Sequence, residues 1–189
     1  MKRLLLMLSL VVGLASTALA VDQVVFVAQG ASYDGTATKV TIPTGEITNK
    51  TFTAEGVCSV SHEKKNNSSS QVTGNLVRWY ANDVMTITPV EGISISKIEI
   101  NCSTTSYADV LGKVTVNGNK FTVSGSVASY EPSEVITGSF SFAPTAQVRF
   151  SSIVISYVGD VIPVAPKLPV VTFGDVTAEN NGKYEVVEG

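Results

Sequence analysis

The segment ISISKIEINC, residues 93–102, decides the fold class of this chain. Its apolar residues alternate with polar ones, which is the pattern of a β-strand with one buried face. The first two isoleucines share one parity, whereas the last two and the cysteine fall on the other. A regular strand would turn these groups to opposite faces. We therefore predict a β-bulge at Ser96-Lys97, which returns both groups to the core.

The segment QVRFSSIVISY, residues 147–157, shows the same parity change, with a predicted slip at Ser151-Ser152. Between these two segments, Asn117-Gly118-Asn119 separates two short apolar runs and predicts a hairpin, because Asn and Gly tolerate positive φ. From Val24 onward, short alternating runs are separated by turn residues, a pattern typical of a sandwich or barrel. No convincing helix is found. We expect an all-β fold, an antiparallel and jelly-roll-like β-sandwich over residues 21–160.

The composition favours the same fold class. When residues 1–20 are set aside as a leader, 169 residues remain, with 27 Val, 11 Ile and 18 Thr but only 3 Leu. Branched side chains lose rotamer freedom against the preceding turn of a helix and fit a pleated sheet, whereas helices favour Leu. A helical bundle is therefore excluded.

Both ends of the chain differ from the centre. Residues 1–20, MKRLLLMLSLVVGLASTALA, combine two cations, an apolar stretch and a small-x-small ending, which predicts a cleaved signal peptide. The apolar stretch is too short and interrupted for a spanning helix, so we expect a secreted, periplasmic or cell-surface protein that is not held in a membrane after cleavage. Residues 161–169 contain prolines at a spacing of three and predict a linker. Residues 170–189 are either the start of a second β module, with a further domain beyond, or a C-terminal tail.

Two cysteines, Cys58 and Cys102, belong to the exported part. An oxidising compartment permits a disulfide between them, which would stabilise the fold by about 4 kcal/mol. Each also lies within an alternating apolar run, so the alternative is two small buried side chains that never meet. Spacing alone leaves both possibilities open.

The residue inventory argues against catalysis. His62 is the only histidine, and no nucleophile elbow, phosphate-binding loop, dinucleotide-binding glycine pattern or calcium loop accompanies it. Cys58 shares a strand face with His62, but four residues along a strand span about 13 Å. Two cysteines and one histidine are too few for a structural zinc site. We expect no enzymatic activity, catalytic residue, metal or cofactor.

The charge argues against one class of partner. Without Lys2 and Arg3, the chain carries 11 basic and 16 acidic residues, which is a net charge of 11 − 16 = −5. A protein this acidic lacks the basic surface that follows a nucleic-acid backbone. Nucleic acid is therefore not an expected partner.

Exposed aromatic rings make ligand binding the better hypothesis. Tyrosines at strand ends and in loops of a rigid sandwich can stack on sugars, and neighbouring charged groups add directional contacts. Trp79 shares its parity with buried positions, so it is assigned to the core. The candidate ligand-binding residues are Arg78, Tyr80, Tyr107, Asp109 and Tyr130.

Three segments, VRWYANDVMTIT at 77–88, ISKIEINCSTTSYA at 95–108 and QVRFSSIVISY at 147–157, carry a family resemblance. They resemble a β-sandwich module that recurs in exported multidomain proteins of gut anaerobes, beside nucleases, glycosidases and surface repeats. The resemblance covers roughly residues 24–158 and implies an accessory role. It identifies no binding residues.

These observations lead to two expectations about function. The first is an exported, non-catalytic accessory module that binds carbohydrate or a cell-surface ligand. The alternative is a structural spacer or adhesin-like repeat of a surface protein without a ligand of its own, as the proline linker and short tail would suit. Glycan binding separates the two.

Overall fold

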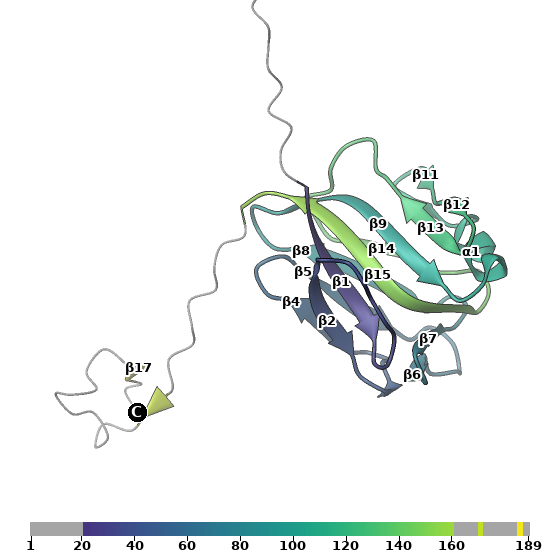
Figure 1. The fold of residues 1–189 in the computed structure, drawn as a ribbon, viewed down its shortest axis with the longest axis horizontal. Helices are drawn as coiled ribbons and strands as arrows, with labels where there is room; N and C mark the ends of the chain where they lie inside the picture. Colours follow the sequence, from purple (N-terminus) through teal and green to yellow (C-terminus); the bar gives the residue numbers. More distant parts are fainter. Residues whose placement is uncertain (1–20, 161–169, 172–184, 187–189) are drawn as a thin grey trace, which may run out of the picture.

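A computed structural model describes residues 21–160, 170–171 and 185–186 of the chain. The described body is a sandwich of two β-sheets, as expected, with β1 and β15 in front and β5, β8 and β14 behind in the view of Figure 1. The predicted signal peptide and proline linker lie outside the described residues. No helix among the described residues is long and apolar enough to cross a membrane.

The larger sheet has nine strands and is built around β15, the longest strand of the molecule. One edge of β15 pairs with β9, while the other pairs first with β7 and then with β1. The order is β12 (Thr122–Ser124), β13 (Val127–Tyr130), β9 (Ser94–Cys102), β15 (Val148–Val158), β7 (Leu76–Trp79), β6 (Gln71–Thr73) and β3 (Gly45–Glu46), with β1 (Asp22–Ala28) beside β15 and β2 (Thr38–Ile42) beside β1.

The smaller sheet has four antiparallel strands in the order β14 (Phe140–Phe142), β8 (Val84–Pro89), β5 (Cys58–Glu63) and β4 (Thr51–Ala54). A separate hairpin joins β10 (Thr115–Val116) to β11 (Asn119–Lys120). Asn117 and Gly118 between them have φ values of 47° and 84°, which confirms the predicted hairpin and its cause.

The core lies between the two sheets and is made mainly of branched aliphatic side chains. Trp79 is fully buried, as its parity indicates, and its ring meets Phe142 and Phe150 edge to face, with centroids 5.6 and 6.2 Å apart. Phe142 belongs to the smaller sheet and Phe150 to the larger one, so the indole contacts both layers.

Both predicted bulges are confirmed. In the β9–β15 ladder, Lys97 pairs with Ser156 and Ile95 with Tyr157, so Ser96 has no partner residue. At the other end of the ladder, Cys102 pairs with Phe150 and Asn101 with Ser152, which leaves Ser151 unpaired. The isoleucines on both sides of Ser96 are buried, because the extra residue restores the inward parity.

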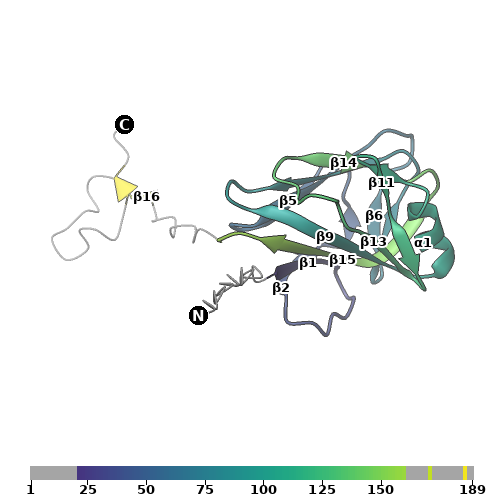
Figure 2. The ribbon, with the colours of Figure 1, turned by 90° about the horizontal axis from the view of Figure 1, so that it is seen from above.

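One strand pair departs from the antiparallel expectation. β1 and β2 run parallel, and residues 29–37 connect them across the outer face of the larger sheet (Figure 2). Ala31, Tyr33 and Ala37 of this connection pack on Val25, Val27 and Val154. This cover explains why β1 is buried on both of its faces.

A short helix, α1 (Thr105–Leu111), corrects the expectation of a fold without helices. Ala108 and Leu111, three residues apart, are its buried positions and place one side of the helix against the core. Outside the sandwich, β16 (Val170–Val171) and β17 (Glu185–Val186) pair in parallel.

Candidate functional site

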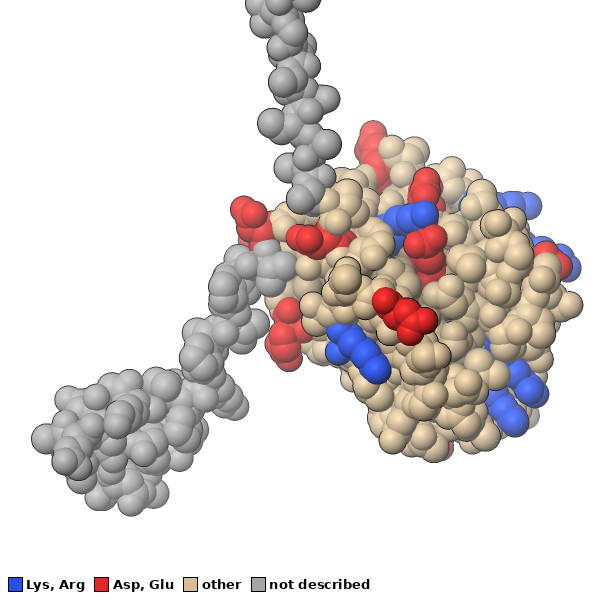
Figure 3. Space-filling model, viewed as in Figure 1, with Lys and Arg blue, Asp and Glu red and all other residues tan. Residues whose placement is uncertain are grey.

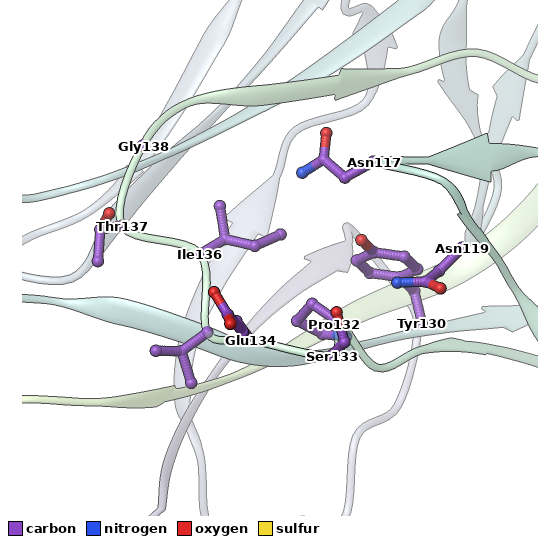
Figure 4. A pocket seen from close by; sticks show the side chains of 10 residues that line it. Asn117, Asn119, Tyr130, Pro132, Ser133, Glu134, Ile136, Thr137 and Gly138 are labelled. Atoms are coloured by element: carbon purple, nitrogen blue, oxygen red, sulfur yellow. The ribbon is translucent and has the colours of Figure 1, made fainter.

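An open polar pocket lies between the β10–β11 hairpin and the loop of residues 131–139 that leads from β13 to β14. Its volume is about 320 Å³, within the range of small-ligand sites. The amides of Asn117 and Asn119 lie on one side and the loop on the other (Figure 4). The lining residues are Asn117, Asn119, Tyr130, Pro132, Ser133, Glu134, Val135, Ile136, Thr137 and Gly138.

Local structure fixes both walls of this pocket. On the hairpin side, Asn117 adopts a left-handed conformation that reverses the chain direction, so that β11 begins at Asn119. On the loop side, Ile136 forms a β-bridge with Ile95, with backbone hydrogen bonds of 2.8 and 2.9 Å in both directions. Ile95 belongs to strand β9 of the larger sheet, so this bridge attaches the loop to the sandwich at Ile136.

Tyr130 stands behind the pocket and does not serve as a stacking surface. Its side chain is fully buried, and its hydroxyl donates a hydrogen bond of 3.1 Å to the Val116 carbonyl oxygen. Burial raises the pKa of this phenol. The ring also packs against Phe121, with centroids 5.5 Å apart. The prediction of an exposed sugar-stacking ring at Tyr130 is therefore wrong, because the strand turns this ring inward.

The pocket offers uncharged hydrogen-bonding groups and one carboxylate. Two amides, the hydroxyls of Ser133 and Thr137, and Glu134 provide donors and acceptors, while Pro132 and Ile136 provide apolar surface. Such a mixture suits a small polyhydroxylated ligand better than an apolar one. No group of three or more potential metal-ligating side chains occurs among the described residues.

The other predicted residues do not reach this pocket. Arg78 and Tyr80 lie at the β7 end of the larger sheet, and both are half-buried. Tyr107 and Asp109 lie on α1, where Tyr107 packs partly on the core and Asp109 is exposed. The structure therefore separates the five candidates into three places.

The disulfide alternative is wrong: Cys58 and Cys102 are free, buried thiols. Cys102 is opposite Phe150, near the start of β15. Cys58 is opposite Pro89 in the smaller sheet, so the two cysteines lie in different layers of the sandwich. Facing sheets are about 10 Å apart, whereas a disulfide needs Cα atoms within about 7 Å.

His62 lies inside the sandwich rather than at an accessible site. His62 is 3% exposed, and neither ring nitrogen has a hydrogen-bond partner in the part of the chain that the structure describes. Burial lowers its pKa, and nearby Asp83 opposes this shift. Asp83 is itself buried and accepts hydrogen bonds from the Ser70 hydroxyl and the Lys65 backbone N–H, each at 2.8 Å. Because Ser70 is also fully buried, this cluster holds a loop in place and presents no nucleophile to a substrate.

Comparison of the chain with protein-family models, with curated proteins and with solved structures found no match. The functional argument therefore depends on the pocket itself. Sequence reasoning missed its loop residues, since Pro132, Ser133 and Gly138 are indistinguishable from ordinary turn residues. The Asn-Gly-Asn turn was visible, but only as a hairpin signal.

Proposed function

We propose that the protein is an exported, non-catalytic accessory module that binds carbohydrate through the pocket between Asn117, Asn119 and the 131–139 loop. The observation that carries this proposal is the lining of that pocket: amides, hydroxyls and a carboxylate converge on a cavity of about 320 Å³. Sugar hydroxyls both donate and accept hydrogen bonds, and these groups satisfy both needs. The predicted signal peptide and the family resemblance support export and an accessory role.

The direct test is a glycan array followed by calorimetry with the best ligand. The variant Asn119→Ala/Glu134→Ala removes one group from each wall of the pocket and leaves the buried Tyr130 untouched. We expect it to lose at least tenfold in affinity, because polar ligand groups are left without partners. The matched control is Asn67→Ala/Glu55→Ala, which makes the same exchanges at exposed positions outside the pocket.

The outcomes separate the possibilities. If the pocket variant binds as tightly as the unmodified protein, the site is elsewhere and the assignment of the pocket fails. If the unmodified protein binds no glycan, carbohydrate binding fails as well, and the spacer or adhesin-like repeat becomes the better explanation.

A further inference from the structure

Two arginines oppose each other on the outer face of the larger sheet. Arg78 of β7 lies directly opposite Arg149 of β15 in the antiparallel register. Their sequence neighbours Trp79 and Phe150 point into the core, so both arginines point outward, and both are half-buried. Directly opposed residues have β-carbons about 5 Å apart. The two arginine side chains therefore leave the sheet from neighbouring positions on the same face.

No carboxylate of the described residues forms an ion pair with either arginine. The acidic residue of the same cross-strand row is Glu46, which pairs with Gln71 and lies two strands from Arg78, or about 10 Å. The Glu46 carboxylate accepts hydrogen bonds from Ser69 and Thr48, which lower its pKa. In Figure 3, the blue side chains over the β7 end of the sheet have no red neighbour in contact.

The opposed pair of Arg78 and Arg149 costs the folded protein free energy when no anion is bound to it. Like charges directly opposite on a sheet destabilise it. In addition, Nε of Arg149 is buried and has no hydrogen-bond partner among the described residues. An unmet buried donor on a charged group costs free energy, which a bound acceptor would recover.

The choice of arginine is also specific. The chain has three arginines, and apart from Arg3 they are the two residues of this pair; every other cation is a lysine. Arginine presents a planar fork of N–H donors that matches an oxyanion in a bidentate manner, whereas lysine acts as a point charge. Two forks side by side suit a carboxylate or sulfate group.

We propose that Arg78 and Arg149 form an oxyanion site that binds a carboxylate or sulfate group of a ligand. Gln71, opposite Arg78 on β6, borders the site with a further donor. Arg149 lies six residues along β15 from Ile155. Ile155 lies two strands from Tyr130, which lines the carbohydrate pocket. The two sites are therefore roughly 20 Å apart, and the oxyanion site does not depend on the proposed function.

The site is tested with inorganic sulfate as the probe. Thermal unfolding of the purified protein is followed in sodium sulfate and in sodium chloride at equal ionic strength, which keeps screening constant. At sulfate concentrations about tenfold above the dissociation constant, we expect a specific rise of roughly 3–5 °C in Tm. Arg78→Gln/Arg149→Gln is expected to lose this rise while melting no lower than the unmodified protein in chloride, because the repulsion is gone.

Controls separate a site from a general salt effect, since sulfate stabilises many proteins weakly. Lys39→Gln/Lys113→Gln removes the same charge from exposed positions and should keep the full sulfate response. If the glutamine pair does not fold, Arg78→Lys/Arg149→Lys keeps the charges and should still lose most of the response, because an ammonium group cannot bind in a bidentate manner. An equal response in the unmodified protein and the arginine variants, or no specific response in the unmodified protein, would overturn the proposal.

A second arm identifies the source of the oxyanion. Binding is compared for a sulfated polysaccharide, a uronic-acid polysaccharide and a neutral one. We expect acidic chains to bind at least tenfold more tightly than the neutral chain, with the difference abolished in Arg78→Gln/Arg149→Gln and retained in Asn119→Ala/Glu134→Ala. Loss of the difference in the pocket variant alone would overturn the assignment to the arginines.

Discussion

The indole N–H of Trp79 donates a hydrogen bond of 2.9 Å to the backbone carbonyl oxygen of Asp83. This bond joins the end of β7 in the larger sheet to the start of β8 in the smaller one. Asp83 in turn holds the loop of residues 64–70 through Ser70 and Lys65. One side chain therefore fixes the crossing between the two layers.

Replacing Trp79 should be among the most damaging changes in the molecule. We expect Trp79→Ala to lower the free energy of unfolding by about 3–5 kcal/mol, because it leaves a cavity between both sheets. Trp79→Phe keeps much of the ring but leaves the Asp83 carbonyl without a partner, at a cost of about 1–3 kcal/mol. Denaturant titration measures both values. A near-neutral Trp79→Ala would mean that the ring is not buried.

The buried His62 makes stability depend on pH. Burial lowers the pKa of its imidazole below the ordinary value of 6.5, so the unfolded chain binds a proton at a pH where the folded protein does not. The free energy of unfolding should therefore fall as the pH drops below about 6.5, by at most about 1.4 kcal/mol per pH unit, until the folded pKa is reached. His62→Leu should remove this part of the pH dependence. Equal pH dependence in both proteins would contradict the assignment.

The thiols of Cys58 and Cys102 should be present but unreactive. Burial raises the pKa of each to about 12, so the nucleophilic thiolate is scarce at neutral pH. We expect a thiol reagent to detect two free thiols in the protein unfolded without reductant and almost none in the folded protein. A count that rises only after reductant is added would show that a disulfide forms after all.

Gly159 follows β15 and has a φ of 125°, a conformation that other residues rarely adopt. A β-carbon there would also collide with the Gly92 carbonyl oxygen. Gly159→Ala should therefore lower the free energy of unfolding by about 2 kcal/mol or more. Gly138→Ala is the control, because its β-carbon would meet no atom within 4 Å and its φ is not positive. Similar melting temperatures for the two variants would refute this account.

The β-sandwich, the core and both bulges could be predicted because each leaves a local pattern. An extra residue at Ser96 or Ser151 changes the parity of the buried side chains, and this change is visible in one strand alone. The parallel pairing of β1 with β2 leaves no such trace, since it depends on how residues 29–37 cross the sheet. Helix α1 was hidden for a related reason: its Ser- and Thr-rich start is typical of a loop.

The candidate sites were less predictable than the fold, because they depend on which strands become neighbours. Arg78 is among the candidate ligand-binding residues of the sequence, but its counterpart Arg149 lies 71 positions later, and nothing local to either residue reveals their register. Tyr130 was misjudged because its inward orientation follows from its pairing with Ile98. The loop of residues 131–139, which lines the pocket, consists of residue types that occur in any turn.

The pairing of β1 with β15 has a mechanical consequence. Asp22 is opposite Tyr157, so the chain enters and leaves the sandwich at the same end (Figure 1). Tension applied between these two points would open the strand pair like a zipper, one residue pair after another, instead of shearing all of its bonds at once. A strand pair that is unzipped separates at a lower force than one that is sheared. This geometry fits the proposed binding module, with Arg78 and Arg149 at the end opposite to the attachment points, better than a spacer that carries tension.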